Sequence, residues 1–234
     1  MLLEYCLTTM LGVYVNTLAV LAGAFAGLVF IKPLQTYRHV ITESVGVLVL
    51  ALGIYGIKDM NSPAIVLISL LVGGLIGAAM DIEGHLGRLT QSLQQRFQGQ
   101  QITEGFVYAT TLFVVGPMTI IGSINAGLMK DYSILFLKSV MDGFSAAALS
   151  AAYGMGVFLS ALAVLIVQGA IALFSAQLSF LQLPMYVNDF SAVGNLLIAM
   201  IGLRMLGIKE IKVGNYLPAL LIQIFLAWLV GALV

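Results

Sequence analysis

Charged residues are scarce in this chain, and their scarcity excludes most soluble folds. Aspartate, glutamate, lysine and arginine make up 9% of the 234 residues, whereas 61% of the residues are hydrophobic. A soluble globule needs more polar surface than this to face water. The formal net charge is zero, so the chain lacks the basic excess typical of nucleic-acid binding. We therefore expect a membrane protein whose main partner is the lipid bilayer and which binds no nucleic acid.

Residues that bind metals or carry out catalysis are also few. The chain has one cysteine, Cys6, and two histidines, His39 and His85. A single cysteine excludes an internal disulfide, and these three residues form no pattern with metal-ligand spacing. The HExxH and GxSxG motifs are absent, as are the glycine loops that bind nucleotides. We expect no enzyme activity, no cofactor and no metal site.

Long apolar runs, in contrast, recur along the whole chain. Each has about 18 to 25 residues, enough for a helix to cross a hydrocarbon layer about 30 Å thick. The runs are uniformly apolar and rich in Gly and Ala, whereas the strands of a membrane barrel alternate polar and apolar positions. The sequence predicts an all-α, polytopic transmembrane helix bundle of about eight spans, forming one domain over residues 1–234. The expected spans are 8–31, 40–57, 63–81, 105–129, 132–152, 155–178, 190–206 and 216–234.

Two of the apolar runs have echoes later in the chain. GVYVNTLAVLAGAFAGLVF at residues 12–30 resembles GVFLSALAVLIVQGAIALF at residues 156–174. SVGVLVLALGIYGIK at residues 44–58 resembles AVGNLLIAMIGLRMLGIK at residues 192–209, with a short insertion. An odd number of crossings separates each copy from its echo, so the copies have opposite orientations. Inverted repeats of this kind are a recurrent construction of secondary transporters, and some channels share it.

The predicted repeats are residues 1–81 and 154–234, with two unique spans in residues 105–153 between them. The third pair of spans shows little identity. Residues 82–104 are polar, and their leucines follow helical spacing, which predicts an amphipathic helix at the cytoplasmic surface. Such a helix either anchors the chain to lipid or binds a cytoplasmic partner. Lysine and arginine are concentrated in the loops of one side, which predicts that both termini lie outside.

The first unique span contains a helix breaker near its centre, Gly116 followed by Pro117. Proline removes a backbone donor and clashes with the preceding turn, so we expect the span to break there. Broken backbone at bilayer depth is tolerated where it is buried or lines a polar cavity. Ser123 and Asn125 would then bind a small solute or ion beside the freed carbonyls. The alternative is an ordinary kink that only shapes packing.

The second unique span carries two charges of opposite sign, Lys138 and Asp142, four residues apart and so on one helical face. Charged side chains near the bilayer centre are costly, which favours a functional, switchable pair. A static pair that orients helices is the alternative. Asn16 and Thr17 in the first span and Asn195 in the seventh either complete this site or join helices by hydrogen bonds.

The remaining polar and small residues have simpler interpretations. Glu43 and Arg204 lie near the cytoplasmic ends of their spans, where snorkelling or capping is expected. Asp81 and Glu83 are expected at a charged helix end. The spacing of Gly23 and Gly27, and of Gly73 and Gly77, predicts close approach between helices. Faces of this kind would also allow a homodimer.

The chain resembles a family of uncharacterised bacterial membrane proteins of the YqgA and YdfK type. SINAGL, DYSILFLKSVMDG and SAVGNLLIAMIGLRMLGIKEIKVGNYLPALL carry the resemblance, together with VNTLAVLAG, DIEGHLGRL and EGFVYATTLFVVGPM, so it covers nearly the whole chain. The resemblance implies a multi-pass protein of the bacterial cytoplasmic membrane and supplies no substrate. In the family a glutamine and an aspartate occupy the positions of Asn125 and Ala126, so an acidic ligand is missing here.

These observations favour a transporter of a small solute or ion, with its site between the inverted halves. A monovalent cation, a proton or a small zwitterion fits the mixed charge of Lys138 and Asp142. A channel is an alternative within the same class. In a different class, the chain would be a membrane scaffold or sensor that binds a cytoplasmic partner through residues 81–105.

Overall fold

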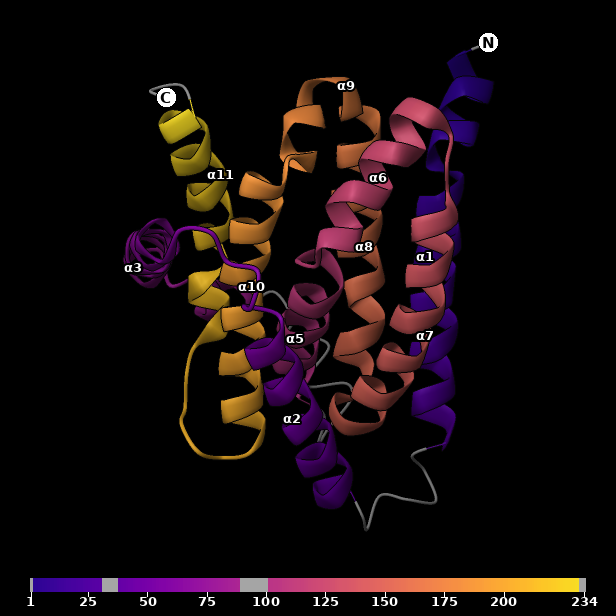
Figure 1. The fold of residues 1–234 in the computed structure, drawn as a ribbon. Coiled ribbons are helices and arrows are strands. Elements are labelled where there is room, and N and C mark those ends of the chain that lie inside the picture. The colour runs from indigo at the N-terminus through magenta and orange to yellow at the C-terminus, as the bar shows by residue number, and fades with distance from the viewer. Residues whose placement is uncertain (1, 31–37, 89–100, 232–234) are drawn as a thin grey trace. The chain divides into compact units, whose positions relative to one another are not determined.

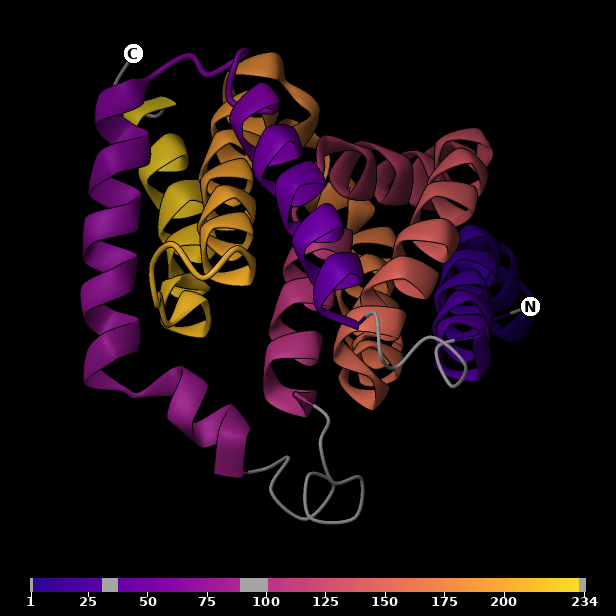
Figure 2. The ribbon, with the colours of Figure 1, turned by 90° about the horizontal axis from the view of Figure 1, so that it is seen from below.

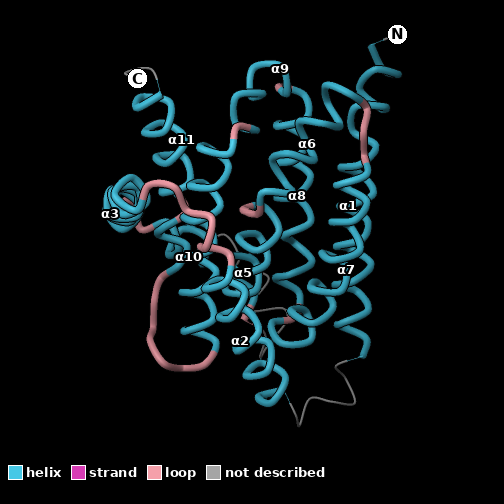
Figure 3. Tube along the Cα trace, in the orientation of Figure 1, coloured by secondary structure: helices cyan, strands magenta, loops and turns pink. Residues whose placement is uncertain are grey.

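The structure is a computed structural model that describes residues 2–30, 38–88 and 101–231, and within these ranges it is built of helices and loops (Figures 1 and 3). The helices are α1 (Leu2–Phe30), α2 (Arg38–Tyr55), α3 (Pro63–Ala79), α5 (Ile102–Val114), α6 (Pro117–Met129), α7 (Ser133–Tyr153), α8 (Met155–Leu173), α9 (Ser175–Leu178), α10 (Pro184–Met205) and α11 (Pro218–Gly231). Two short 3-10 helices, η2 (Ser179–Gln182) and η3 (Val213–Tyr216), precede α10 and α11. A further short helix, Ile82–Arg88, follows α3.

The all-α prediction is confirmed for the described residues, in which each expected span overlaps a helix or a pair of helices. Four helices are long and apolar enough to cross a membrane, namely residues 8–29 of α1, α7, α8 and α10. Two bent pairs, α3 with Ile82–Arg88 and α5 with α6, pass the same test if each pair counts as one span. The apolar part of α2 and the η3–α11 region are shorter. Within residues 2–30, 38–88 and 101–231, the structure thus supports four to six spans, so the expected count of eight is not confirmed.

The chain divides into two compact units, and each unit draws on both ends of the sequence. The first unit comprises Met1–Ile41 and Gln100–Leu183, and the second comprises Thr42–Gly99 and Pro184–Val234. The first therefore contains α1 and α5 to α9, whereas the second contains most of α2 together with α3, α10 and α11. The first unit combines α1 of the predicted first repeat with α8 and α9 of the second, and the second unit combines α2 and α3 with α10 and α11.

In the first unit, α1 and α7 run side by side in the same direction (Figures 1 and 2). Glycine permits this contact, because a Cβ added at Gly23 would lie 2.0 Å from the carbonyl oxygen of Gly143. One turn later, a Cβ at Gly27 would lie 2.2 Å from the carbonyl oxygen of Ala147. The Ser150 hydroxyl also donates to the carbonyl of Ala24 at 2.8 Å. The predicted close approach at Gly23 and Gly27 therefore occurs between two helices of the same chain.

Helix α8 also packs against α1 and runs in the opposite direction. The turn that reverses the chain after α7 is Gly154, whose φ of 77° is a conformation that favours glycine. The amino-terminal part of α1 meets the carboxy-terminal part of α8 in a core formed by Met10, Val13, Ala126, Leu135 and Ala172. This core joins α1, α6, α7 and α8 just above the polar residues described below.

In the second unit, α2 packs against α10 in the opposite direction. A Cβ at Gly53 would lie 2.5 Å from the backbone nitrogen of Ala199, and a Cβ at Gly202 would lie 2.6 Å from the backbone nitrogen of Leu50. The two backbones therefore touch through one glycine from each helix. Figure 1 shows α3 end-on and α10 from the side, so the helices of this unit are not all parallel.

Helix α3 packs against the η3–α11 region, again in the opposite direction. A Cβ at Gly73 would lie 2.3 Å from Ala219, and one at Gly77 would lie 1.8 Å from the carbonyl oxygen of Asn215. The core of this unit contains Val66 from α3, Ala192 and Val193 from α10, and Ala219 from α11. The predicted face of Gly73 and Gly77 is thus also filled within the chain.

Candidate functional site

Three of the predicted site residues meet in the first unit. The Lys138 ammonium on α7 lies 2.8 Å from one carboxylate oxygen of Asp142 and donates to the other at 2.9 Å. The side-chain amide of Asn16 on α1 donates to the same carboxylate at 3.0 Å. It also donates to the side-chain carbonyl of Gln168 on α8 at 3.2 Å. We call Asn16, Lys138, Asp142 and Gln168 the Asn16 cluster.

The Asn16 cluster is buried. The exposed fractions are 0% for Asn16 and Gln168, 5% for Lys138 and 6% for Asp142. Burying either charge alone would be strongly unfavourable, and the direct ion pair with its added amide donor offsets that cost. Lys138 and Asp142 pair with each other because residues four apart share one face of a helix.

Two polar atoms of the Asn16 cluster have no hydrogen-bond partner among the described residues. They are the side-chain carbonyl oxygen of Asn16 and the side-chain nitrogen of Gln168. Turning the Gln168 amide over would not pair them, because Asn16 must keep its N–H groups toward Asp142 and the two donors would then face each other. The cluster therefore presents one free acceptor and one free donor, in addition to the ion pair.

Thr17 and Ser123 are buried but make no bond to the Asn16 cluster. The Thr17 hydroxyl donates to the carbonyl of Val13, one turn earlier in α1. The Ser123 hydroxyl of α6 has no hydrogen-bond partner in the described ranges. Ser123 precedes Ala126 by three residues, and Ala126 packs in the same core as Val13. The unpartnered Ser123 hydroxyl is thus on α6, one turn before the residue through which α6 packs against α1.

The predicted break at Gly116–Pro117 is present. Helices α5 and α6 meet there at a bend of 60°. Pro117 begins α6 and is exposed, while Gly116 has an extended backbone (φ −67°, ψ 152°) and nothing within 4 Å of an added Cβ. The Thr119 hydroxyl crosses the break and donates to the carbonyl of Phe113 at 2.8 Å. The break is thus partly closed by a side chain rather than by backbone bonds.

Asn125 and Asn195 each have structural partners. The side-chain carbonyl of Asn125 accepts a hydrogen bond from the side chain of Gln182 in η2 at 2.7 Å. Asn195 belongs to the second unit, where its side-chain amide donates to the carbonyl of Gly56 at 3.0 Å and to that of Ser191 at 2.8 Å. It thereby caps the carboxy-terminal end of α2.

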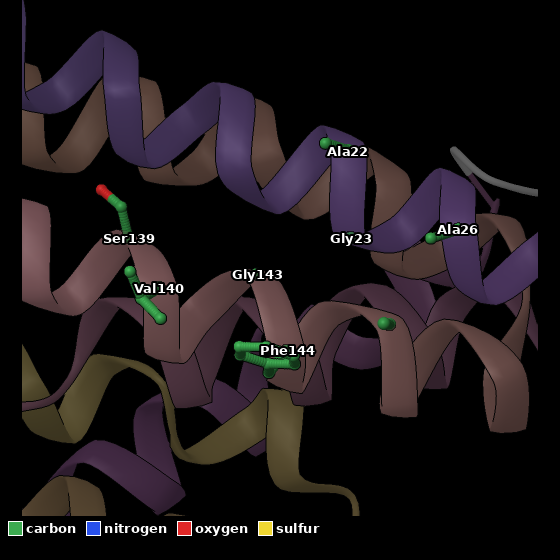
Figure 4. A pocket seen from close by; sticks show the side chains of 8 residues that line it. Ala22, Gly23, Ala26, Ser139, Val140, Gly143 and Phe144 are labelled. Atoms are coloured by element: carbon green, nitrogen blue, oxygen red, sulfur yellow. The ribbon is translucent and has the colours of Figure 1, made fainter.

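A shallow groove lies between α1 and α7, and none of the four residues of the Asn16 cluster lines it (Figure 4). Its volume is about 340 Å³. Ser139 and Gly143, which directly follow Lys138 and Asp142, contribute to its wall, and Figure 4 shows Ala22 and Ala26 on the α1 side. The lining is otherwise composed of small and apolar side chains.

The second unit contains a separate ion pair, and it gives Arg204 a different environment from the one expected from the sequence. Arg204 does not simply reach toward solvent, because its guanidinium lies 2.7 Å from the Glu83 carboxylate and both side chains are largely buried. The other Glu83 oxygen accepts the backbone N–H of Gly214 at 2.8 Å. The backbone N–H of Glu83 donates to the side chain of Asn215 at 2.9 Å. We call this set the Glu83 clamp, and it fixes the helix Ile82–Arg88 to the end of α10 and to η3.

The predicted amphipathic segment is only partly described. Ile82–Arg88 is helical, whereas residues 89–100 lie outside the described residues. Asp81, beside the clamp, faces Arg88 and Lys212 at 3.6 and 3.9 Å, as expected of an exposed charge at a helix end.

Sequence reasoning missed Gln168 and Asp189. Gln168 lies within the second copy of the repeated apolar run, and a glutamine in such a run was the available signal.

Asp189 is buried in α10, and its carboxylate accepts hydrogen bonds from the backbone N–H groups of Asn61 and Ser62 at 2.7 and 3.0 Å. Asp189 therefore caps the amino-terminal end of α3, a role that depends on residues far apart in sequence.

The apolar helices and the buried polar contacts between them are compatible with a helical membrane protein. The chain belongs to the family described as "Protein of unknown function (DUF554)", whose model matches residues 11–228. The resemblance inferred from the sequence motifs is thereby confirmed.

Two relatives extend over nearly the whole chain. "Uncharacterized membrane protein YdfK" of Bacillus subtilis (strain 168) is 32% identical over 218 residues, covering 91% of this chain and 93% of that protein. "Uncharacterized protein YqgA" of Escherichia coli (strain K12) is 34% identical over 229 residues, covering 93% of this chain and 97% of that protein. No solved structure matches significantly.

Proposed function

We propose that the chain is a membrane transporter of a small solute or ion, and that the Asn16 cluster is its binding site. The observation that carries the proposal is a buried ion pair joined to two amide side chains, each with one unpartnered polar atom. Ionisable residues within transmembrane helices are costly and usually mark a pathway for a substrate or ion. A purely structural ion pair would not need unpartnered amide atoms beside it.

The position of the cluster in the repeat supports this proposal. Asn16 lies in α1 and Gln168 in α8, which are the two copies of the first repeated run. Transporters with inverted repeats commonly bind their substrates where the two copies meet. Lys138 and Asp142 come from the unique section, on the helix that packs along α1.

The contacts between repeat-related helices also support an inverted repeat. The pairs α1 with α8, α2 with α10, and α3 with α11 each lie in contact and run in opposite directions. With Gly53 aligned to Gly202, Leu50 aligns to Ala199, and Gly53 meets Ala199 while Gly202 meets Leu50. Such reciprocal contacts are what a twofold relationship between two copies produces. On this proposal the eight expected segments would all belong to the membrane domain.

The broken helix α5–α6 adds a further transporter feature. Discontinuous helices expose backbone groups and helix ends that bind substrates in several transporter folds. In this chain the break lies in the same unit as the Asn16 cluster, and Ser123 on α6 carries a free hydroxyl. We place the protein in a bacterial cytoplasmic membrane with both termini outside, in keeping with the distribution of lysine and arginine.

Flux through vesicles tests the proposal. The purified chain would be reconstituted, and uptake of labelled sodium, potassium, small carboxylates and amino acids would be measured, with a pH-sensitive dye for protons. We expect at least one of these to move, and we expect Asp142→Asn and Lys138→Met to abolish its uptake. Asp131→Asn, an exposed aspartate outside the cluster, is the matched control. Loss of uptake counts only for variants that remain monodisperse and retain a cooperative melting transition.

The same measurement separates the alternatives. Saturating uptake that a second gradient can drive indicates a carrier, whereas large single-channel currents indicate a channel. A scaffold or sensor that acts through residues 81–105 would show no flux in either the wild type or the variants. Complete absence of flux across the panel would therefore overturn the transport proposal.

A further inference from the structure

The Asn16 cluster holds one positive and one negative side chain in direct contact, so its net charge is zero. Lys138 contributes the cation and Asp142 the anion, and the other two members are neutral amides. A bound cation would displace Lys138 from Asp142 and leave the ammonium without an anion. A bound anion would displace Asp142 from Lys138 and leave the carboxylate without a cation. Either outcome leaves a buried charge unpaired, which is strongly unfavourable.

A ligand that carries both charges avoids this penalty. Its ammonium would pair with Asp142 and its carboxylate with Lys138, so that one ion pair is exchanged for two. Both residues belong to α7, so the exchange separates the two charged side chains from each other without breaking an ion pair between helices. Lysine has a long and flexible side chain, which suits it to this movement.

The free polar atoms of the cluster match such a ligand. A primary ammonium has three N–H donors, and the two oxygens of Asp142 with the free carbonyl of Asn16 provide three acceptors. A carboxylate accepts several hydrogen bonds, and the Lys138 ammonium and the free Gln168 amide nitrogen are donors. The donors and acceptors are thus divided between the two ends of the ligand.

We infer that the Asn16 cluster binds a small zwitterion of the α-amino-acid type, with its ammonium on Asp142 and Asn16 and its carboxylate on Lys138 and Gln168. This inference rests on the proposed function, whose solute class it narrows. The cluster residues are at most 6% exposed, which leaves little room around the ion pair and favours the smallest members of the class. Glycine, alanine and valine are therefore the members to test.

Three matched probes test the inference on the purified full-length chain. L-alanine carries both charges, ethylamine lacks the carboxylate, and propionate lacks the ammonium. Binding would be measured by isothermal titration calorimetry and by the rise in melting temperature that a ligand of the native state produces. We expect saturable binding of alanine, or of glycine or valine, and at least tenfold weaker binding of ethylamine, propionate and sodium.

Variants assign the binding to the cluster. Asp142→Asn and Lys138→Met should each weaken amino-acid binding at least tenfold, and Gln168→Leu should weaken it severalfold. Gln168→Leu removes the free donor together with the acceptor of the Asn16 hydrogen bond, and it leaves both charged residues in place, so it remains informative if the charge variants fold poorly. Asp131→Asn should bind as the wild type does.

The results distinguish failure of this inference from failure of the proposed transport function. If sodium, ethylamine or propionate binds with the same dependence on Asp142 and Lys138 while the amino acids do not, the inferred ligand class is wrong. The Asn16 cluster would still be the binding site of a transporter. If no amino acid binds at all, the inference is also wrong, and water suffices to satisfy the free amide atoms. If flux is absent as well, the proposed function fails too.

Discussion

The side-chain amide of Asn16 on α1 donates to the carboxylate of Asp142 on α7 across 3.0 Å, although 126 residues separate them in the chain. This bond connects a helix of the first repeat to the unique section. It also brings the amide within reach of Gln168 on α8. Because α1 contacts both α7 and α8, one residue joins three helices at a buried polar point.

Removing one partner of the buried ion pair should cost more than removing both. Lys138→Met leaves Asp142 buried without its cation, and we expect a loss of about 3–5 kcal/mol in the free energy of unfolding. Lys138→Met with Asp142→Leu removes both charges and should recover much of that loss. Unfolding by SDS in mixed micelles measures both changes. If the double variant regains stability and also transports, the pair is structural only and the proposed role in binding is wrong.

The contact between α1 and α7 should tolerate no side chain at Gly23. Its added Cβ would lie 2.0 Å from a backbone oxygen, so Gly23→Ala should destabilise the protein by about 1–3 kcal/mol or more. Gly116→Ala is the matched control, since its φ of −67° suits alanine and nothing lies within 4 Å. We expect the control to cost less than about 1 kcal/mol, the difference between glycine and alanine at a helix start. Equal losses in both variants would contradict this account of the helix contact.

The Glu83 clamp should show energetic coupling between its charged residues. Arg204→Met leaves the Glu83 carboxylate in a largely buried position with a single backbone donor, and we expect a loss of about 3 kcal/mol. A double-mutant cycle with Glu83→Gln should give a coupling energy of about 0.5–3 kcal/mol. Glu210→Gln is the control, because the Glu210 side chain is 84% exposed and its contact with Arg204 should contribute little. Strict additivity of the two substitutions would rule out the clamp.

Asn195 should act on stability rather than on binding. Asn195→Ala removes a hydrogen bond to the carbonyl of Gly56, at a cost of about 1 kcal/mol. Solute uptake measured in vesicles should persist at the wild-type apparent affinity once the protein is folded. A weakened apparent affinity would instead place Asn195 in the binding site, as its sequence position suggested.

Asp131, in the turn before α7, should give stability that depends on pH. The Ser133 hydroxyl and backbone N–H donate to its carboxylate and lower the pKa of that group. A depressed pKa stabilises the folded state above the ordinary aspartate value of about 3.9, and this stabilisation disappears as the pH falls through the lower folded value. The melting temperature of Asp131→Asn should therefore lie below that of the wild type at pH 7. The two should converge toward pH 3, and a difference that grows on acidification would contradict the assignment.

Local features of the sequence were sufficient for the helices and for two details of the site. Apolar length predicted each helical segment, and Pro117 predicted the break between α5 and α6. The spacing of Lys138 and Asp142 put them on one helical face, where the structure shows them paired. The role of Arg204 was different, because its partner Glu83 lies 121 residues earlier and no local pattern connects them.

The sequence by itself determined that the chain is helical and apolar, where the long helices lie, and that Lys138 and Asp142 share one helical face, because these properties depend on residues within a few turns. Only the tertiary structure decided that Asn16 bonds both Asp142 and Gln168, that Asn125 and Asn195 have other partners, and that glycine faces are filled within the chain. The physical reason is that one apolar helix face resembles another. Which faces meet depends on the fit of side chains and glycines from distant segments.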